Sequence, residues 1–134
     1  MENKDYTAKV IDSSFEKLTG KDKLRYTNFT SMTSLDDVVA ETGEKYPVSV
    51  TGFVTVEVHN EKSSNKDYVK MVLVGEDGTL YVTGSDSFMR EFENIVDVLS
   101  DDFEEGTTPV YEINIFKRPS KNFNNKCFLT CSVQ

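Results

Sequence analysis

The stretch from residue 67 to residue 99 constrains the fold most, because it specifies four successive elements. Apolar and polar side chains alternate over residues 68–73, and this period of two predicts a half-buried strand. The Asp77-Gly78 pair that follows predicts a tight hairpin turn, since glycine adopts the positive φ that such turns require. Residues 79–83 then form the second, shorter strand of the predicted hairpin.

An amphipathic helix is predicted to complete this stretch. Gly84 breaks the strand, Ser85 occupies an N-cap position, and Asp86 lies at the positive end of the helix dipole. The apolar side chains recur at helical spacing on one face, at Phe88, Phe92, Ile95, Val96 and Leu99. Such a stripe on an otherwise acidic helix predicts that the helix packs against the hydrophobic core.

Three more strands are predicted around this block, over residues 47–58, 110–117 and 126–133. The first carries Gly52 in its middle, which is typical of a bent or bulged strand. The order strand, strand, strand, helix, strand, strand predicts a mainly β protein, a five-stranded OB-fold Greek-key barrel with the amphipathic helix between strands 3 and 4. We expect a single domain over residues 1–134, with the barrel at 47–134.

The N-terminal extension, residues 1–46, carries weaker signals. The S-x-x-E pattern at residues 13–16 is typical of a capping box and predicts a short helical turn that ends at Gly20. Residues 24–32 have the composition of an extra strand, and Ser34 begins a second short helix. The first eleven residues are polar and are expected to form a loosely docked arm.

The net charge of −8 at first disfavours nucleic acid as a partner, but the charge is unevenly distributed. Residues 85–105 hold eight acidic residues against one arginine, whereas residues 110–134 hold four basic residues against one glutamate. Because local charge decides what stays bound, the C-terminal hairpin remains a candidate binding region. No apolar run approaches the ~20 residues that cross a membrane, and no signal peptide is evident, so a cytoplasmic protein without membrane partners is expected.

Residue types that carry out catalysis or bind metals are few. The single histidine, His59, ends a predicted strand, and no nucleophile or phosphate-binding motif is present, so an enzyme is not expected. Cys127 and Cys131 lie four residues apart in one predicted strand, with Cα atoms about 13 Å apart, which is too far for a disulfide. We expect two buried thiols, no metal site and no cofactor. The acidic pairs within residues 101–105 are expected to face solvent.

Aromatic side chains favour binding to single-stranded nucleic acid. If the valine-rich faces form the core, alternation leaves one aromatic per strand on the outer face: Phe53, Tyr68, Tyr81, Phe116 and Phe128. Bases stack on such rings for about 1–3 kcal/mol each, and nearby cations neutralise phosphates. The predicted binding residues are Phe53, Lys66, Tyr68, Lys70, Phe116, Lys117, Arg118, Lys121, Phe123 and Lys126. Phe128 and Tyr81 are expected to pack structurally instead.

Two segments, DGTLYVTGSDSFMREFENIVDVL at 77–99 and YEINIFKRPSKNFNNKCFLTCSV at 111–133, resemble the small single-stranded-DNA-binding proteins of tailed bacteriophages. The resemblance covers roughly Val48 to Val133, and SLDDVV at 34–39 is similar to a short helix before their first barrel strand. It implies an OB-fold that coats single-stranded DNA in phage replication or recombination, with Ser120 and Lys121 among the binding positions. Bacterial relatives end in an acidic tail that recruits partners, whereas this chain stops at Gln134, so recruitment through a tail is not expected.

Other functions stay open at this point. The acidic residues between 85 and 105 motivate an acidic OB-fold interaction protein, such as a DNA mimic or an inhibitor of a host enzyme. A third hypothesis is an OB-fold module that binds protein rather than nucleic acid. If the chain binds single-stranded DNA, phage replication or recombination proteins are candidate partners. The sequence leaves the oligomeric state open.

Overall fold

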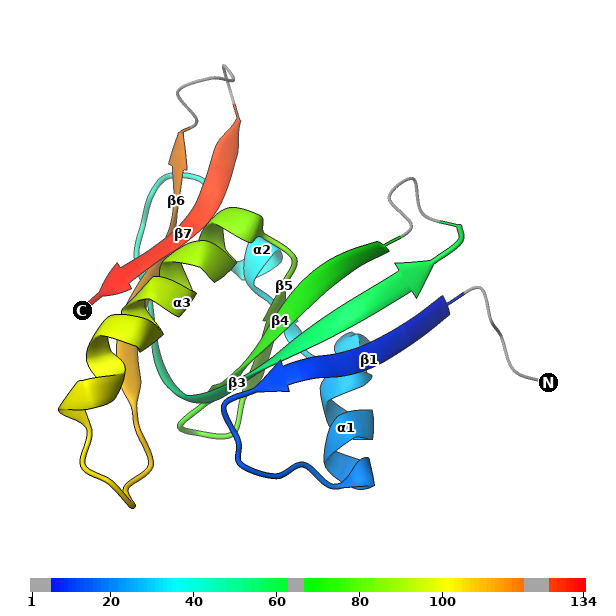
Figure 1. Ribbon diagram of the computed structural model, residues 1–134. Coiled ribbons are helices and arrows are strands. Elements are labelled where there is room, and N and C mark those ends of the chain that lie inside the picture. The colour runs from blue at the N-terminus through cyan, green and yellow to red at the C-terminus, as the bar shows by residue number, and fades with distance from the viewer. Residues whose placement is uncertain (1–5, 63–66, 120–125) are drawn as a thin grey trace.

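A computed structural model describes residues 6–62, 67–119 and 126–134 of the chain (Figure 1). The strands are β1 (Tyr6–Ser13), β2 (Thr33–Ser34), β3 (Tyr46–Asn60), β4 (Asp67–Gly75), β5 (Leu80–Thr83), β6 (Tyr111–Pro119) and β7 (Cys127–Val133). They form one strongly curled sheet in the order β2-β5-β4-β3-β6-β7, and β1 pairs with β3 (Figure 1). The sheet has the shape of a half barrel, so the prediction of a mainly β protein is confirmed.

The helical elements in the described ranges are α1 (Gly20–Thr27), α2 (Leu35–Val38), α3 (Asp86–Leu99) and the 3-10 turns η1 (Phe29–Ser31) and η2 (Ser100–Asp102). Helix α3 begins as predicted, because the Ser85 hydroxyl accepts a hydrogen bond from the Phe88 amide at 3.3 Å. Its apolar stripe faces the sheet, and Phe88 and Phe92 are fully buried there. None of the helices described is long and apolar enough to cross a membrane.

The predicted hairpin joins β4 to β5. Gly78 has a φ of 90°, and the Gly75 amide donates to the Thr79 carbonyl at 2.8 Å. The Asp77 carboxylate accepts a hydrogen bond from the Thr79 amide at 3.0 Å and so closes the turn. The turn signal therefore predicted the connection correctly.

Strand β3 contains a bulge that changes which face its side chains occupy. Its pairing with β4 shifts register between Val50 and Gly52, so one extra residue lies in β3. Side chains before the bulge, such as Val50, pack in the core under α3. Side chains after it, such as Val54 and Val56, pack on the opposite face. The prediction that all these valines share one face is wrong, because the extra residue reverses the alternation.

A second hydrophobic cluster lies on the opposite face of the sheet, where the N-terminal extension covers it. Tyr26 of α1 is buried against Val54, Val56 and Val72, and Phe15 packs beside them. The Phe15 ring stacks on Tyr26 with ring centroids 6.0 Å apart. The N-terminal extension therefore contributes directly to the core.

Several predictions for the N-terminal extension are wrong. Of the predicted loosely docked arm, residues 6–11 belong to strand β1, antiparallel to β3, and residues 1–5 lie outside the described residues. Helix α1 begins after Thr19, whose hydroxyl accepts from the Asp22 amide at 3.2 Å, so the true capping box lies six residues beyond the predicted one. Helix rather than strand occupies residues 20–27. The short helix predicted after Ser34 is present as α2.

Helix α3 lies along β7 (Figure 1). The Ser87 hydroxyl of α3 donates to the Leu129 carbonyl of β7 at 2.7 Å, and so uses a backbone acceptor at the edge of this strand. Strand β5 pairs on its other side with β2, in parallel. The described sheet therefore has seven strands, where a five-stranded barrel and one extra N-terminal strand were predicted, and α3 packs along β7 at one edge.

Candidate nucleic-acid interface

A hollow of about 420 Å³ lies between the first half of α3 and the hairpin of β6 and β7. Its lining residues include Arg90 of α3, Phe116 and Arg118 of β6, and Phe128 and Thr130 of β7. We call it the β6–β7 hollow. It is the site in the described structure where two arginines and two phenylalanines come together.

Antiparallel pairing of β6 with β7 positions the strand residues of the hollow. Phe116 lies opposite Thr130, and Arg118 lies opposite Phe128. Residues two apart on a strand share a face, so these four side chains lie on one face of the hairpin, where Phe116 and Thr130 are buried and Phe128 and Arg118 are exposed. The intervening side chains, such as Ile115 and Leu129, are buried in the core under α3.

Two of these side chains, Arg118 and Phe116, form a cation–π contact. The Arg118 guanidinium lies over the Phe116 ring, with Cζ 5.1 Å from the ring centroid. Phe116 is only 7 % exposed, whereas Phe128 is 38 % exposed. The prediction that Phe128 packs structurally while Phe116 stays open is therefore reversed in the structure.

Helix α3 supplies the opposite wall of the hollow. Ser87, Arg90 and Glu91 line it, because residues three and four apart share one face of a helix. Within the described residues, neither Arg90 nor Arg118 forms an ion pair with a carboxylate. The hollow therefore offers two guanidinium groups that can donate to an anion and one ring on which a planar group can stack.

The other predicted aromatics do not join this surface. Phe53 lies on the α3 side and packs edge-on against Phe92, with ring centroids 5.3 Å apart. Acidic residues surround its exposed part, including Asp12 and Glu93. Tyr68 packs on the opposite face of the sheet with the second cluster. The expectation of one outer face with an aromatic from every strand is wrong, because the bulge in β3 and the N-terminal extension divide the rings between two cores.

Tyr81 is buried, as predicted, and contacts Tyr46. Lys70 lies over the Phe29 ring, with Nζ 5.1 Å from the ring centroid, on the side of the N-terminal extension. Lys117 extends to α2, where its Nζ donates to the Asp36 carbonyl at 2.7 Å. These two lysines therefore contact the protein itself and lie outside the β6–β7 hollow.

The remaining predicted residues lie between strands in the sequence. Lys126 is exposed, one residue before β7. Four predicted residues lie outside the described residues, namely Lys66, Ser120, Lys121 and Phe123. Arg90 and Ser87 were not predicted as binding residues, because they lie on a helix whose sequence pattern is acidic and predicts packing against the core. Their spacing of three residues on the helix would have placed them on one face.

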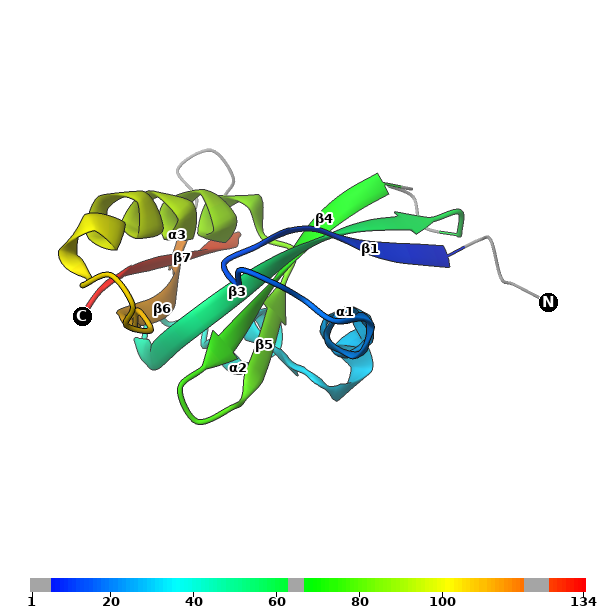
Figure 2. The same ribbon diagram turned by 60° about the horizontal axis from the view of Figure 1, so that its bottom comes forward.

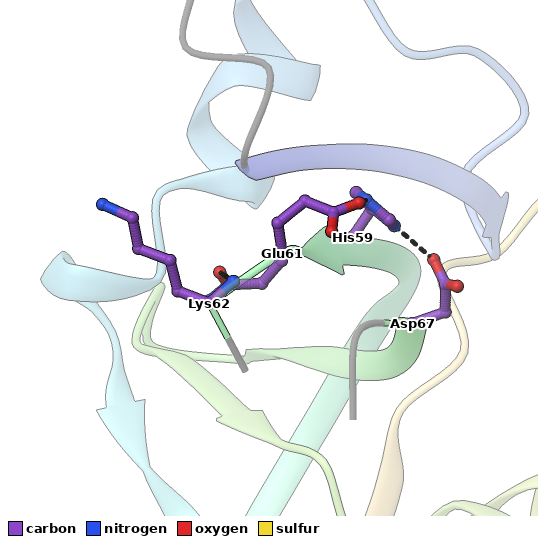
Figure 3. Close-up of polar contacts among 5 residues, drawn as sticks. His59, Glu61, Lys62 and Asp67 are labelled. Carbon is purple, nitrogen blue, oxygen red and sulfur yellow. Dashed lines mark hydrogen bonds and ion pairs between the residues drawn. The ribbon is translucent and has the colours of Figure 1, made fainter. Parts of the chain in front are cut away.

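His59 occupies a different site, where the end of β3 pairs with the start of β4 (Figure 3). Its Nδ1 lies 2.7 Å from Asp67 Oδ1, and its Nε2 lies 2.7 Å from Glu61 Oε1. The hydrogen bond to Asp67, followed by that to Glu61, raises the pKa of His59. The two carboxylates bond to opposite sides of one ring, and no group of side chains that could hold a metal occurs in the described part of the chain.

No protein family, curated protein or solved structure was found that matches this chain. The resemblance to phage single-stranded-DNA-binding proteins thus remains an expectation from the sequence. The chemistry of the β6–β7 hollow carries the functional interpretation.

Proposed function

We propose that this chain is a non-enzymatic OB-fold protein that binds single-stranded DNA with little sequence preference, in phage replication or recombination. The observation that supports this best is the exposed Phe128 ring beside the Arg118–Phe116 stack. A ring open to solvent and flanked by guanidinium groups suits an unstacked base with its phosphates. Duplex DNA lacks exposed base faces, so it should bind less.

Each residue has a separate role in this proposal. Phe128 stacks on a base, while Arg118 is held by Phe116 and pairs with a neighbouring phosphate. Arg90 reaches the backbone from the other wall of the hollow. Stacking tolerates every base because each has a π face, so no base-specific hydrogen bonds are required.

The fold is compatible with the proposal. From β3 onward the elements follow the order strand, strand, strand, helix, strand, strand, on a strongly curled sheet. This order is typical of the OB-fold, which binds nucleic acids through strand faces and the loops beside them. Lys121 and Lys126 lie between β6 and β7 in the sequence, so further cations adjoin the hollow in sequence.

Fluorescence anisotropy with a labelled oligo-dT tests the proposal directly. The protein should bind the single strand and bind a duplex of equal length much more weakly, with affinity falling steeply as salt increases. Equal binding of both forms, or no binding of the single strand, would reject it. Phe128→Ala locates the site, because its ring is exposed and its removal leaves the core intact.

An acidic interaction protein is the alternative, supported by the exposed carboxylates on and after α3. Glu93, Asp97, Asp101 and Asp102 are all exposed, and Val98 among them is 64 % exposed. Such a surface could imitate DNA toward a basic host protein. Charge reversal at Glu91 or Asp97 would then abolish activity, while Phe128→Ala would leave it unchanged.

A further inference from the structure

A second groove, of about 280 Å³, lies on the other side of the molecule between β1 and α1. Ala8, Lys9 and Val10 line it from β1, and Lys23 and Leu24 line it from α1, with Gly20 and Thr27 at its ends. Figure 2 shows α1 beneath β1. We call it the β1–α1 groove.

Strand β1 forms one edge of the described sheet. It pairs with β3 along one side, and the described residues provide no strand along its other side. An edge strand presents unpaired backbone amides and carbonyls, which can bond to another extended chain. Regular pairing with β3 runs from Tyr6 to Val10, and the register shifts between Val10 and Asp12. About five residues of this edge can therefore accept a regular partner strand.

The groove also contains an apolar side chain that is largely exposed to solvent. Leu24 is 73 % exposed, the largest exposed fraction among the exposed large hydrophobic residues of the described chain. It faces the groove together with Ala8 and Val10. An added strand places alternate side chains on one face, so its apolar residues can pack here while the others point away.

The cations at the groove select the charge of the occupant. Lys9 and Lys23 line it, and Lys21 lies nearby on α1. No ion pair involves these lysines within the described residues. Acidic side chains are therefore favoured, and basic ones are repelled.

We propose that the β1–α1 groove binds an extended acidic peptide segment of a partner protein, which adds to the sheet as a strand beside β1. Backbone hydrogen bonds to the free edge provide affinity. Lys9 lies on the face of β1 opposite to Ala8 and Val10, so apolar residues facing Leu24 and carboxylates on the other face, beside Lys9, provide selectivity. This site is separate from the β6–β7 hollow, so the partner and a nucleic acid can bind together.

Edge strands are also protected in monomeric proteins by lysines and bulges, and Lys9 and the irregularity after Val10 are such features. Protection alone predicts no binding of any extended peptide. Strand addition predicts binding that depends on charge and on the peptide's own amides. The two interpretations therefore differ in a measurable way.

The probe is an acetylated, amidated eight-residue peptide that alternates glutamate with valine, titrated into the ¹⁵N-labelled full chain. We expect NMR shift changes at residues 6–10 and on α1. A peptide alternating lysine with valine, and a fully N-methylated glutamate–valine peptide, serve as matched controls and should not bind. Lys9→Glu should weaken binding of the acidic probe about fivefold or more, because Lys9 lies on the face that the carboxylates of the probe occupy.

Comparable binding of the lysine peptide or the N-methylated peptide would overturn the proposal, as would shift changes confined to the β6–β7 hollow. No binding of the acidic probe at millimolar concentration would also overturn it and favour a merely protected edge. Oligo-dT affinity of Lys9→Glu should equal that of the parent chain, because Lys9 lies outside the β6–β7 hollow. Failure of peptide binding is thus distinguishable from failure of the single-stranded-DNA proposal.

Discussion

The Arg118 guanidinium covers the Phe116 ring, with Cζ 5.1 Å from the ring centroid. Phe116 is only 7 % exposed, and the contact places a cation beside it in the lining of the β6–β7 hollow. Phe128, which lies opposite Arg118 on the neighbouring strand, remains the exposed ring. The exposed ring, to which our proposal assigns base stacking, is therefore the one that was predicted to pack structurally.

Phe128→Ala should weaken oligo-dT binding by about 1–3 kcal/mol, roughly 5- to 150-fold, because one stacking platform is lost. Anisotropy titrations at fixed salt measure this. Tyr6→Ala is the matched control, because Tyr6 is 40 % exposed but lies on β1, and it should retain the parent affinity. Equal effects of the two substitutions would argue against a site at the hollow.

Arg118→Ala should lower the slope of log K against log salt by about 0.7, since one phosphate contact on a single strand is lost. Arg118→Lys should keep the slope but weaken binding, because lysine retains the charge without the planar stack on Phe116. The measurement is an oligo-dT titration at four salt concentrations. Lys21→Ala, on exposed α1, is the charge-matched control; a slope change as large as that of Arg118→Ala would indicate a general charge effect.

Gly52→Ala should destabilise the fold by about 1–3 kcal/mol, because the new Cβ would lie 2.3 Å from Cζ of Phe15. Displacing Phe15 disturbs its stack on Tyr26 and the second cluster. Urea unfolding measures the loss of free energy. Gly20→Ala is the matched control, because nothing lies within 4 Å of its added Cβ, and it should not destabilise.

A double-mutant cycle links this cost to Phe15. In a Phe15→Ala background, Gly52→Ala should cost much less, since the ring that the new methyl group meets is gone. An undiminished cost would place the strain in the β3 backbone instead.

His59 should titrate above its ordinary pKa of 6.5, because hydrogen bonds to Asp67 and Glu61 stabilise the imidazolium. When folding raises the pKa of a group, that group stabilises the fold fully at pH values below its pKa in the unfolded chain. The stabilisation is lost as the pH rises through its pKa in the folded protein. The stability advantage over His59→Gln should therefore shrink on passing from pH 6 to alkaline pH. NMR of the single histidine measures its pKa, and Asp67→Asn should lower it more than Glu61→Gln; an unshifted pKa would contradict the contacts in Figure 3.

The two cysteines should differ in reactivity. Burial, and then the charge of Glu91, raise the pKa of Cys131 to about 12, whereas Cys127 is exposed. A thiol reagent at pH 8 should modify one thiol in the native protein and both after unfolding. Modification of both thiols in the native state would show that β7 opens readily. The expectation of two buried thiols is correct for Cys131 alone, because the core contact of β7 begins after its first two residues.

Local signals predicted the elements that depend on neighbouring residues. The N-cap at Ser85 and the turn at Gly78 were correct, because each rests on hydrogen bonds or a backbone conformation within a few residues. The N-terminal extension was harder, because two capping patterns compete there and only Thr19 begins a helix. Tyr26 of this helix packs against β3 and β4, which are distant from it in the sequence.

The sequence by itself determined the mainly β class, the hairpin, the amphipathic helix and the bend expected at Gly52. Tertiary structure alone decided which ring is exposed and which strand faces lie in which core. The physical reason is the bulge in β3, which reverses alternation, together with Phe15, which closes over Gly52 from a distant part of the chain. Periodicity tells which residues share a face of one strand, but only packing between elements tells which face meets solvent.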